Sequence, residues 1–288
     1  METVNVNKQQ VIAEKAIFSE TLKQIVVDFP LRSQEIIFNR WGVFNSHSLT
    51  LEEIGKKYGI TRERVRQVIR EVLKKVREKK SDTLFVQMQE KVTLALELNG
   101  GIMSEKALLF ALGKGMQTEQ ASAAFFLECF EGIINNEIKG ELKTSFSLPT
   151  FDLENWRTVK DAAITVLKAQ KKPLSVEDLY KLVKTQLPAL DLSKEAFAHY
   201  LEVSEEIKQN TFSKWGIAKW KEISPKGTRE KAYLVLKEAK KPLHFRDIAK
   251  KIDQYHLNKK KTHAQTVHNE LINLFCNIPE MQRFLGFF

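Results

Sequence analysis

Apolar residues recur three and four positions apart through most of the chain, which is the spacing of amphipathic helices. The pattern is regular from residue 50 to residue 79, in TLEEIGKKYGITRERVRQVIREVLKKVREK. There Val65, Ile69, Val72 and Val76 follow one another at intervals of four, three and four residues, so they form one apolar stripe on a helix. The pattern predicts a mainly α-helical chain.

The same stretch contains the signals that begin and end two short helices. Thr50 and Glu53 have the spacing of a capping box, Gly59 supplies a tight turn, and Thr61 can cap the helix that follows. Two helices joined by a glycine turn predict a helix-turn-helix.

The outer face of the second helix carries polar side chains, Arg62, Glu63, Arg66, Gln67 and Arg70. Arg and Gln pair bidentately with guanine and adenine edges, and Glu accepts from cytosine, so Arg62, Glu63, Arg66 and Gln67 are candidate base-reading residues. Basic residues suited to phosphate contacts are Arg64, Arg70, Lys74, Lys75, Arg77, Lys79 and Lys80. The pattern alone also fits a solvated helix stabilised by Arg–Glu pairs.

Two later segments repeat each other. AITVLKAQKKPLSVEDLYKLV (163–183) aligns with AYLVLKEAKKPLHFRDIAKKI (232–252) at a constant offset of 69 residues. In each copy a helix ends at Lys-Lys-Pro-Leu, because proline lacks an N–H and disfavours the helical conformation of the preceding residue. Ser175 is a candidate N-cap for the next helix, with Asp178 three positions on. Third helices are expected at 193–203 and at about 262–276.

Short strands are expected after these helices. TFSKWGIAKW (211–220) has the aromatic content and central glycine of a β-hairpin, and three helices with a terminal hairpin make a winged helix. A further winged helix is expected before these two copies. One helix ends at Gly100, two more are expected in SEKALLFALGK and EQASAAFFLECFEGII, and a strand pair follows in IKGELKTSFSLP (138–149). We therefore expect tandem helix-turn-helix and winged-helix domains with short β-hairpin wings, at 1–82, 83–150, 151–226 and 227–288.

The net charge of +10 is concentrated in two segments. Residues 32–80 contain thirteen Lys and Arg against six Asp and Glu, and residues 228–262 contain eleven against four. Two basic segments indicate two places for a polyanion, although basic helices are also often simply solvated. No run of eighteen apolar residues and no secretory signal is evident, so we expect a cytoplasmic, nucleoid-associated protein without a membrane partner. Cys129 and Cys276 lie in apolar helical patterns and are expected to be buried free thiols.

The segment TLEEIGKKYGITRERVRQVIREVLKKVR closely resembles region four of primary bacterial sigma factors, which reads the −35 promoter element. The resemblance runs over about 45 residues from near Arg32, and the run from Thr61 to Gln67 is highly specific. It implies that Arg62, Glu63 and Gln67 touch bases with Arg66 on the same face, and that Thr61 and Arg64 lie near phosphates. It also implies RNA polymerase as a second partner. No segment resembles the sigma region that binds core polymerase and melts the −10 element. We therefore expect a domain that binds the −35 element without a domain that melts the promoter.

The C-terminal segments KKPLHFRDIAKKI and KKKTHAQTVHNELI (259–272) resemble the HARE-HTH family of winged helices, which includes the folded part of the RNA polymerase delta subunit of some bacteria. The resemblance covers roughly residues 228–288. It implies a nucleic-acid-facing surface made of Lys259, Lys260 and Lys261 and of a helix carrying Gln265, His268 and Asn269. The final RFLGFF predicts a shortened wing. The acidic third helix of the middle copy, SKEAFAHYLEVSEEI, favours binding to protein, or a spacer role, over contact with DNA.

No pattern in the sequence predicts catalysis. The six histidines are scattered, and His263 and His268, five residues apart, have a poor spacing for two zinc ligands. No phosphate-binding glycine loop and no Ser-His-Asp or Cys-His signature is present. We therefore expect a protein that is not an enzyme and that uses no cofactor or metal.

These observations together predict a sequence-specific transcription regulator whose partner is promoter-like double-stranded DNA. Two alternatives stay open, namely an accessory RNA polymerase subunit and a nucleoid-type protein that binds DNA with little sequence choice. The oligomeric state and the target genes are not encoded in these patterns.

Overall fold

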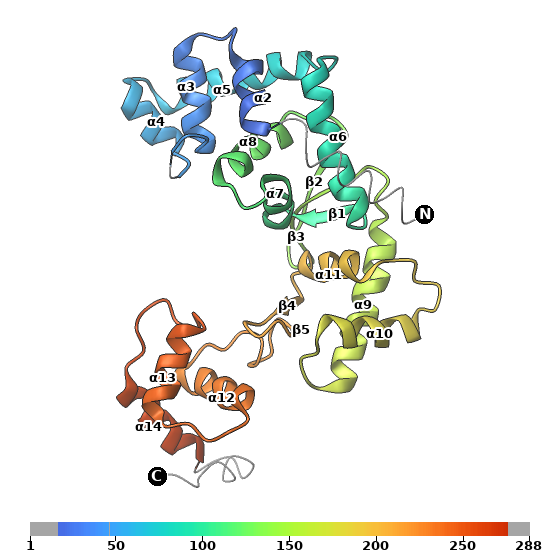
Figure 1. Ribbon diagram of the computed structural model, residues 1–288, viewed down its shortest axis with the longest axis vertical. Coiled ribbons are helices and arrows are strands. Elements are labelled where there is room, and N and C mark those ends of the chain that lie inside the picture. The colour runs from blue at the N-terminus through green and yellow to red at the C-terminus, as the bar shows by residue number, and fades with distance from the viewer. Residues whose placement is uncertain (1–16, 46, 276–288) are drawn as a thin grey trace. The chain divides into compact units, whose positions relative to one another are not determined.

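The computed structural model describes residues 17–45 and 47–275 (Figure 1). The described residues form 13 helices and two small antiparallel sheets, which confirms the mainly α-helical class with helix-turn-helix domains. Contacts divide the chain into two compact units, Met1–Asp152 and Leu153–Phe288. The two units contain different sets of helices and strands.

The first unit begins with four helices, α2 (Phe18–Val26), α3 (Leu31–Trp41), α4 (Leu51–Tyr58) and α5 (Arg62–Glu78). The predicted capping box is present, because Thr50 Oγ1 accepts from the N–H of Glu53 and the Glu53 carboxylate accepts from the N–H of Thr50 at 2.8 Å. α4 ends at Gly59, whose φ of 64° lies in the left-handed region that favours glycine. Thr61 then caps α5 by accepting from the N–H of Arg64 at 3.1 Å. The predicted helix-turn-helix is confirmed at each of these positions.

A second group of elements completes this unit, namely α6 (Thr83–Leu98), β1 (Ile102–Ser104), α7 (Glu105–Gly113), α8 (Gln117–Leu127), β2 (Ile134–Ile138) and β3 (Leu142–Ser147). The strands form an antiparallel sheet in the order β1–β3–β2, in which Ile102 and Ile134 both lie opposite Ser147. Three helices with a small terminal sheet are the parts expected of a winged helix in this region.

Two expected boundaries in this group are wrong. The helix expected to run through residue 134 ends at Leu127, and Gly132, with a φ of 90°, lies in a turn just before β2. The strand pair begins at Ile134 instead of residue 138, and the register shifts between Asn136 and Ile138. The local apolar pattern is the same in a helix end and in a short strand, so it does not fix this boundary.

The two groups of helices share one hydrophobic core. α8 packs on α2 and α3, where the ring centroids of Phe18 and Phe126 are 6.0 Å apart and those of Trp41 and Phe125 are 5.1 Å apart. Phe126 also contacts Phe85 of α6 at 6.3 Å. The described residues of the two segments expected as separate domains, 1–82 and 83–150, therefore pack around one core. The division between these domains stays a prediction.

The third helix of the second group faces protein. α8, with the sequence QTEQASAAFFL, contains no Lys or Arg. Its Glu119 is only 7% exposed and accepts a hydrogen bond from the N–H of Ser19 in α2, at 3.3 Å. Third helices of such units can enter a DNA groove only when they are exposed and polar. α8 instead holds the helix-turn-helix in place.

The second unit begins with α9 (Leu153–Gln170), α10 (Val176–Gln186), α11 (Lys194–Glu202), β4 (Ile207–Gln209) and β5 (Trp215–Ile217). Ser175 caps α10 as predicted, by accepting from the N–H of Asp178 at 3.1 Å. After the Lys-Lys-Pro break, Leu174 exchanges two backbone hydrogen bonds with Trp215, at 2.9 and 2.7 Å. This bridge joins the break between helices to the hairpin.

The hairpin of this copy lies earlier than residues 211–220. Its first strand is β4, and Asn210 builds the turn, because its Oδ1 accepts from the N–H groups of Phe212 and Lys214 at 2.9 and 3.0 Å. Only the second strand, β5, falls within the predicted segment. The buried Trp215 fixes that strand against Leu174. The Asn210 side chain closes the turn between the two strands by accepting backbone hydrogen bonds.

The acidic third helix of this copy is shorter than SKEAFAHYLEVSEEI. α11 ends at Glu202, and Glu206 lies in the segment before β4. Glu206 pairs with the buried Lys160 of α9 at 2.9 Å. Part of the acidity that suggested a protein-binding helix is therefore used inside the copy, and the protein-binding or spacer role stays a prediction.

The second copy contains α12 (Thr228–Ala239), α13 (Phe245–Gln254) and α14 (Ala264–Phe275). Their core is Ala232, Val235, Leu236, Ile248, Ala249, Ile252, Val267 and Leu271. The repeated lysines Lys171 and Lys240 follow equivalent helices with φ values of 52° and 53°, so the two breaks share a backbone conformation. The expected shortened wing at RFLGFF and the thiol of Cys276 lie outside the described residues.

We expect Phe126→Ala to destabilise the whole first unit by about 3–5 kcal/mol, because it removes the ring on which both groups of helices pack. Amide hydrogen exchange should then accelerate in α3 and α5 as well as in α6 and α7. Phe110→Ala makes the same change at a side chain that is 63% exposed, and it should stay within about 0.5 kcal/mol of the wild type. Loss of protection confined to α6–α8 would show that the two groups fold separately.

Burial raises the pKa of the Cys129 thiol to about 12. At pH 8 roughly one thiol in ten thousand is then ionised, so we expect very slow reaction with Ellman's reagent in the folded protein and fast reaction in urea. The measurement should use a Cys276→Ser variant so that only one thiol reports. Complete labelling of the folded variant within minutes would contradict the buried position.

Candidate nucleic-acid interface

α5 separates its apolar and polar side chains completely. Its inner face consists of buried side chains, Val65, Val68, Ile69, Val72, Leu73 and Val76, which confirms the predicted stripe. The candidate DNA-contacting residues on this helix and at its N-cap are all exposed: Thr61, Arg62, Glu63, Arg64, Arg66, Gln67, Arg70, Lys74 and Lys75. The four candidate base-reading residues fall within the first two turns. A helix fixed by one face and polar on the other has the form needed to enter a major groove.

Glu63 and Arg66 form a bidentate ion pair on this exposed face. Arg66 Nε donates to one carboxylate oxygen of Glu63 at 2.8 Å and Nη2 donates to the other at 2.6 Å. The hydrogen bond from Arg66 lowers the pKa of Glu63, and the carboxylate in turn raises the pKa of Arg66. Both side chains are thus charged at neutral pH and are held in one orientation before any ligand arrives.

A second polar pair lies beside the first. Arg64 Nη1 donates to Gln67 Oε1 at 3.1 Å and lies 3.9 Å from a carboxylate oxygen of Glu71. Arg62 and Arg70 make no ion pair with another described residue. The face therefore carries two polar pairs and two further guanidinium groups, those of Arg62 and Arg70, which lie near the Glu63 carboxylate and help to lower its pKa without forming an ion pair with it.

The helix-turn-helix is supported by a polar network that sequence reasoning missed. Asn39 of α3 is 5% exposed, and its Nδ2 donates to the hydroxyl of Tyr58 at 3.0 Å. Asn39 Oδ1 accepts from Lys57 Nζ at 3.0 Å, and Arg32 donates to the backbone oxygen of Tyr58. Burial raises the pKa of Tyr58 to about 12, so its hydroxyl stays neutral. The only signal in the sequence was a polar residue inside an apolar helical pattern.

The predicted C-terminal contacts also lie together. Lys259, Lys260 and Lys261 are exposed in the segment between α13 and α14, and Gln265 follows in the first turn of α14. His268 is one turn later, with its ring centroid 4.9 Å from that of Phe245. These residues form one basic and polar surface within the second unit.

The basic loop is fixed at its end by Thr262, which is 9% exposed. The carboxylate of Asp253 accepts from both the N–H of Thr262, at 2.9 Å, and its hydroxyl, at 2.5 Å. Asn258 Nδ2 donates to the same hydroxyl at 2.6 Å. The lysines between Asn258 and Thr262 are thereby held outward. Sequence reasoning named the lysines but missed the residues that position them.

The described residues contain neither a candidate membrane span nor a candidate metal site. No helix among them is long and apolar enough to cross a membrane. No group of three or more His, Cys, Asp and Glu in the described part of the chain is arranged to hold a metal ion.

Two segments match known families. Residues 30–78 match the family described as "Sigma-70, region 4". Residues 228–275 match the HARE-HTH family, whose description includes the words "restriction endonuclease HTH domain". The two predicted resemblances are therefore confirmed, and each covers a segment that contains one of the two surfaces described above. The chain therefore contains two segments that match helix-turn-helix DNA-binding modules.

Similar proteins match over short parts of the chain. The "RNA polymerase sigma-C factor" of Nostoc sp. is 29% identical over 85 residues, which cover 30% of this chain and 20% of that protein. The "RNA polymerase sigma factor SigA" of Bacillus sp. is 34% identical over 61 residues, or 21% and 16% of the two chains. The "RNA polymerase principal sigma factor HrdD" of Streptomyces griseus is 36% identical over 67 residues, or 23% and 20%. The chain thus spans a fifth or less of the length of these relatives.

We expect Thr61→Ala to fray the first turn of α5 at a cost of about 1 kcal/mol, because it removes the acceptor for the N–H of Arg64. Amide hydrogen exchange at Arg64 should accelerate, whereas exchange at Val72 should not change. Thr61→Ser keeps the hydroxyl and should restore most of the protection. Equal exchange at Arg64 in all three proteins would show that the cap does not hold the turn.

Proposed function

We propose that this protein is a sequence-specific transcription regulator that reads a promoter-like duplex with α5. Arg62, Glu63, Arg66 and Gln67 would contact base edges in the major groove. The flanking residues would contact phosphates: Thr61, Arg64, Arg70, Lys74 and Lys75. The observation that carries the proposal is the exposed polar face of α5, which lies on a segment that matches sigma region 4 and is fixed by a fully buried inner face.

The ion pair between Glu63 and Arg66 supports reading of sequence over simple attraction to phosphate. A carboxylate in the first turn stabilises the helix N-terminus, but it weakens attraction to DNA by charge alone, because it repels phosphates. A glutamate can accept from cytosine N4 and can orient an arginine toward guanine. Beside a base pair that offers neither the cytosine N4 donor nor a guanine for the arginine, the carboxylate would lose its water without gaining a hydrogen bond. That cost would disfavour binding to other sequences.

The C-terminal surface would add affinity. Lys259, Lys260, Lys261, Gln265 and His268 form a basic and polar surface without the guanidinium pairs of α5. Phosphate contacts bind without choosing sequence, and linking two modest binders in one chain strengthens the total interaction by effective concentration. The group from α6 to β3 would act as a support, since α8 is committed to packing inside the first unit. The middle copy would bind protein or act as a spacer.

An accessory role on RNA polymerase is the second candidate. The similar proteins named above are sigma factors of RNA polymerase, and the corner between α2 and α3 exposes two apolar side chains, Val27 at 63% and Leu31 at 77%. Such side chains can contact a protein partner. A polymerase subunit should co-purify with polymerase at high salt. A nucleoid-type protein should show neither this behaviour nor a sequence preference.

We expect the full chain to prefer a duplex carrying a −35-like hexamer over a shuffled duplex by tenfold or more at physiological salt. A preference of that size corresponds to about 1.4 kcal/mol, within the range of one bidentate base contact. Gln67→Ala and Arg66→Ala should abolish the preference. Gln87→Ala removes the same amide from an exposed position on α6 and should leave the preference intact. Fluorescence anisotropy measures all four proteins.

Equal binding to both duplexes would reject this hexamer as the target, and a selection from random duplexes would then test for another. Equal binding across that selection would reject sequence reading altogether. Affinity for any duplex should also fall steeply with salt, because each phosphate contact releases counterions.

A further inference from the structure

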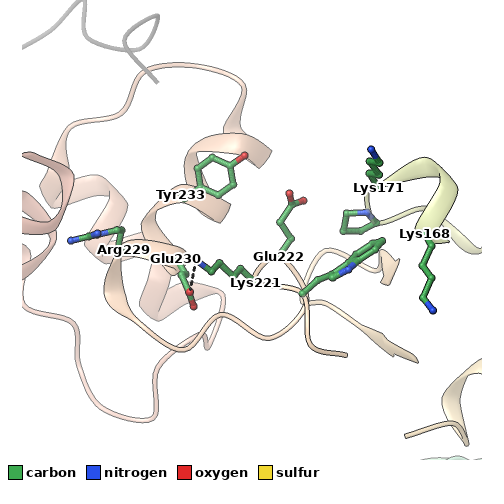
Figure 2. A pocket seen from close by; sticks show the side chains of 9 residues that line it. Lys168, Lys171, Lys221, Glu222, Arg229, Glu230 and Tyr233 are labelled. Atoms are coloured by element: carbon green, nitrogen blue, oxygen red, sulfur yellow. Dashed lines mark ion pairs between the residues drawn. The ribbon is translucent and has the colours of Figure 1, made fainter. Parts of the chain in front are cut away.

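The second unit contains a cavity of about 530 Å³ that none of the DNA-binding features uses. It is lined by residues from three segments: Lys168, Lys171, Pro173, Trp220, Lys221, Glu222, Arg229, Glu230 and Tyr233. Figure 2 shows Arg229, Glu230 and Tyr233 on α12 at one side and Lys168 and Lys171 near the end of α9 at the other. The volume is within the range of about 300–1,000 Å³ typical of small-molecule sites.

The charges around this cavity leave an excess of cations. Four basic residues and two carboxylates line it, and both carboxylates already have partners. Glu222 pairs with Lys237 at 2.7 Å, and Glu230 accepts from the N–H of Lys226 at 2.8 Å and pairs with Lys221 at 3.7 Å. A ligand would therefore meet little free negative charge here.

Two of the cations are available to a ligand. Lys168 and Lys171 are exposed, and neither makes an ion pair with another described residue. Across the cavity Arg229 donates from Nε to Glu270 at 2.9 Å, a bond that uses one of its five N–H donors. Figure 2 shows the amine ends of Lys168 and Lys171 extending in different directions, so each offers a separate point charge to an anion such as phosphate at the rim of the cavity.

Two aromatic side chains in the lining, Trp220 and Tyr233, are half-buried. An aromatic ring that keeps one face accessible gives a flat heterocycle a surface to stack on, and such stacking accepts any base. Cations alone would attract any anion, whereas rings and cations in one cavity select a ligand with both a flat ring and a negative charge.

We propose that this cavity binds a nucleotide, with its phosphate on Lys168 or Lys171 and its base against Trp220 and Tyr233. The nucleotide is either a free mononucleotide or one residue of a single strand, since both offer the same chemistry. The inference does not depend on reading of duplex DNA by α5.

The test is equilibrium binding to the full chain of two probes, N-methylanthraniloyl-AMP and a fluorescein-labelled single-stranded oligothymidylate of twelve nucleotides. Lys168→Glu combined with Lys171→Glu should weaken binding at least tenfold. Tyr233→Leu keeps apolar bulk but removes the ring, and it should weaken binding about fivefold. The matched control is Lys172→Glu combined with Lys181→Glu, which makes the same charge change at exposed lysines of the same copy that do not line the cavity. It should stay within twofold of the wild type.

Loss of AMP binding in the cavity variants, with the control unchanged, would establish a site for free nucleotides. Loss confined to the oligonucleotide would establish a site for a single strand. No binding of either probe at 1 mM, or equal weakening by the cavity and control variants, would overturn the inference. Gln67→Ala should bind both probes as the wild type does, so failure of this site and failure of duplex reading can be told apart.

Discussion

Phe126 touches the rings of Phe18, Phe85, Phe125 and Phe130, and through them α8 holds both the helix-turn-helix and the elements that follow it. The position of α5 depends on this packing, because α2 and α3 carry α5 on one side and α8 on the other. Interiors packed at this density do not deform gradually. The exposed face of α5 is therefore supported by one continuous core that includes α8 as well as α2 and α3.

The polar surface of α5 shows how a binding face can be ordered without a ligand. Two side-chain pairs are held in defined orientations by hydrogen bonds, Glu63 with Arg66 and Arg64 with Gln67. Less side-chain freedom would therefore be lost on binding a partner. The C-terminal loop reaches the same result through Asp253 and Thr262, which fix the backbone around the lysines. In both places the candidate contact residues are exposed, and the residues that orient them are neighbours in sequence or space.

The sequence alone predicted features that depend on residues three or four positions apart. The capping box at Thr50, the cap at Thr61 and the apolar stripe of α5 are of this kind, since the chemistry that forms them is contained in one helical turn. The sequence did not predict that α8 packs against the rest of the protein. Phe18 and Phe126 are far apart in the sequence, and helical periodicity gives information only on residues a few positions apart. The cavity beside Tyr233 and the bridge between Leu174 and Trp215 were missed for the same reason. Each depends on which distant segment arrives as a neighbour.

The shared core of the first unit has a consequence for where this chain can be divided. The segment similar to sigma factors, residues 30–78, ends before α6 and contains neither Phe85 nor Phe126. A fragment cut at those limits would expose one side of Trp41 to water, and the remainder would expose Phe125. The family match marks residues 30–78, whereas the core that α3 and α5 share with α8 extends beyond them, so we expect a stable fragment to reach through β3.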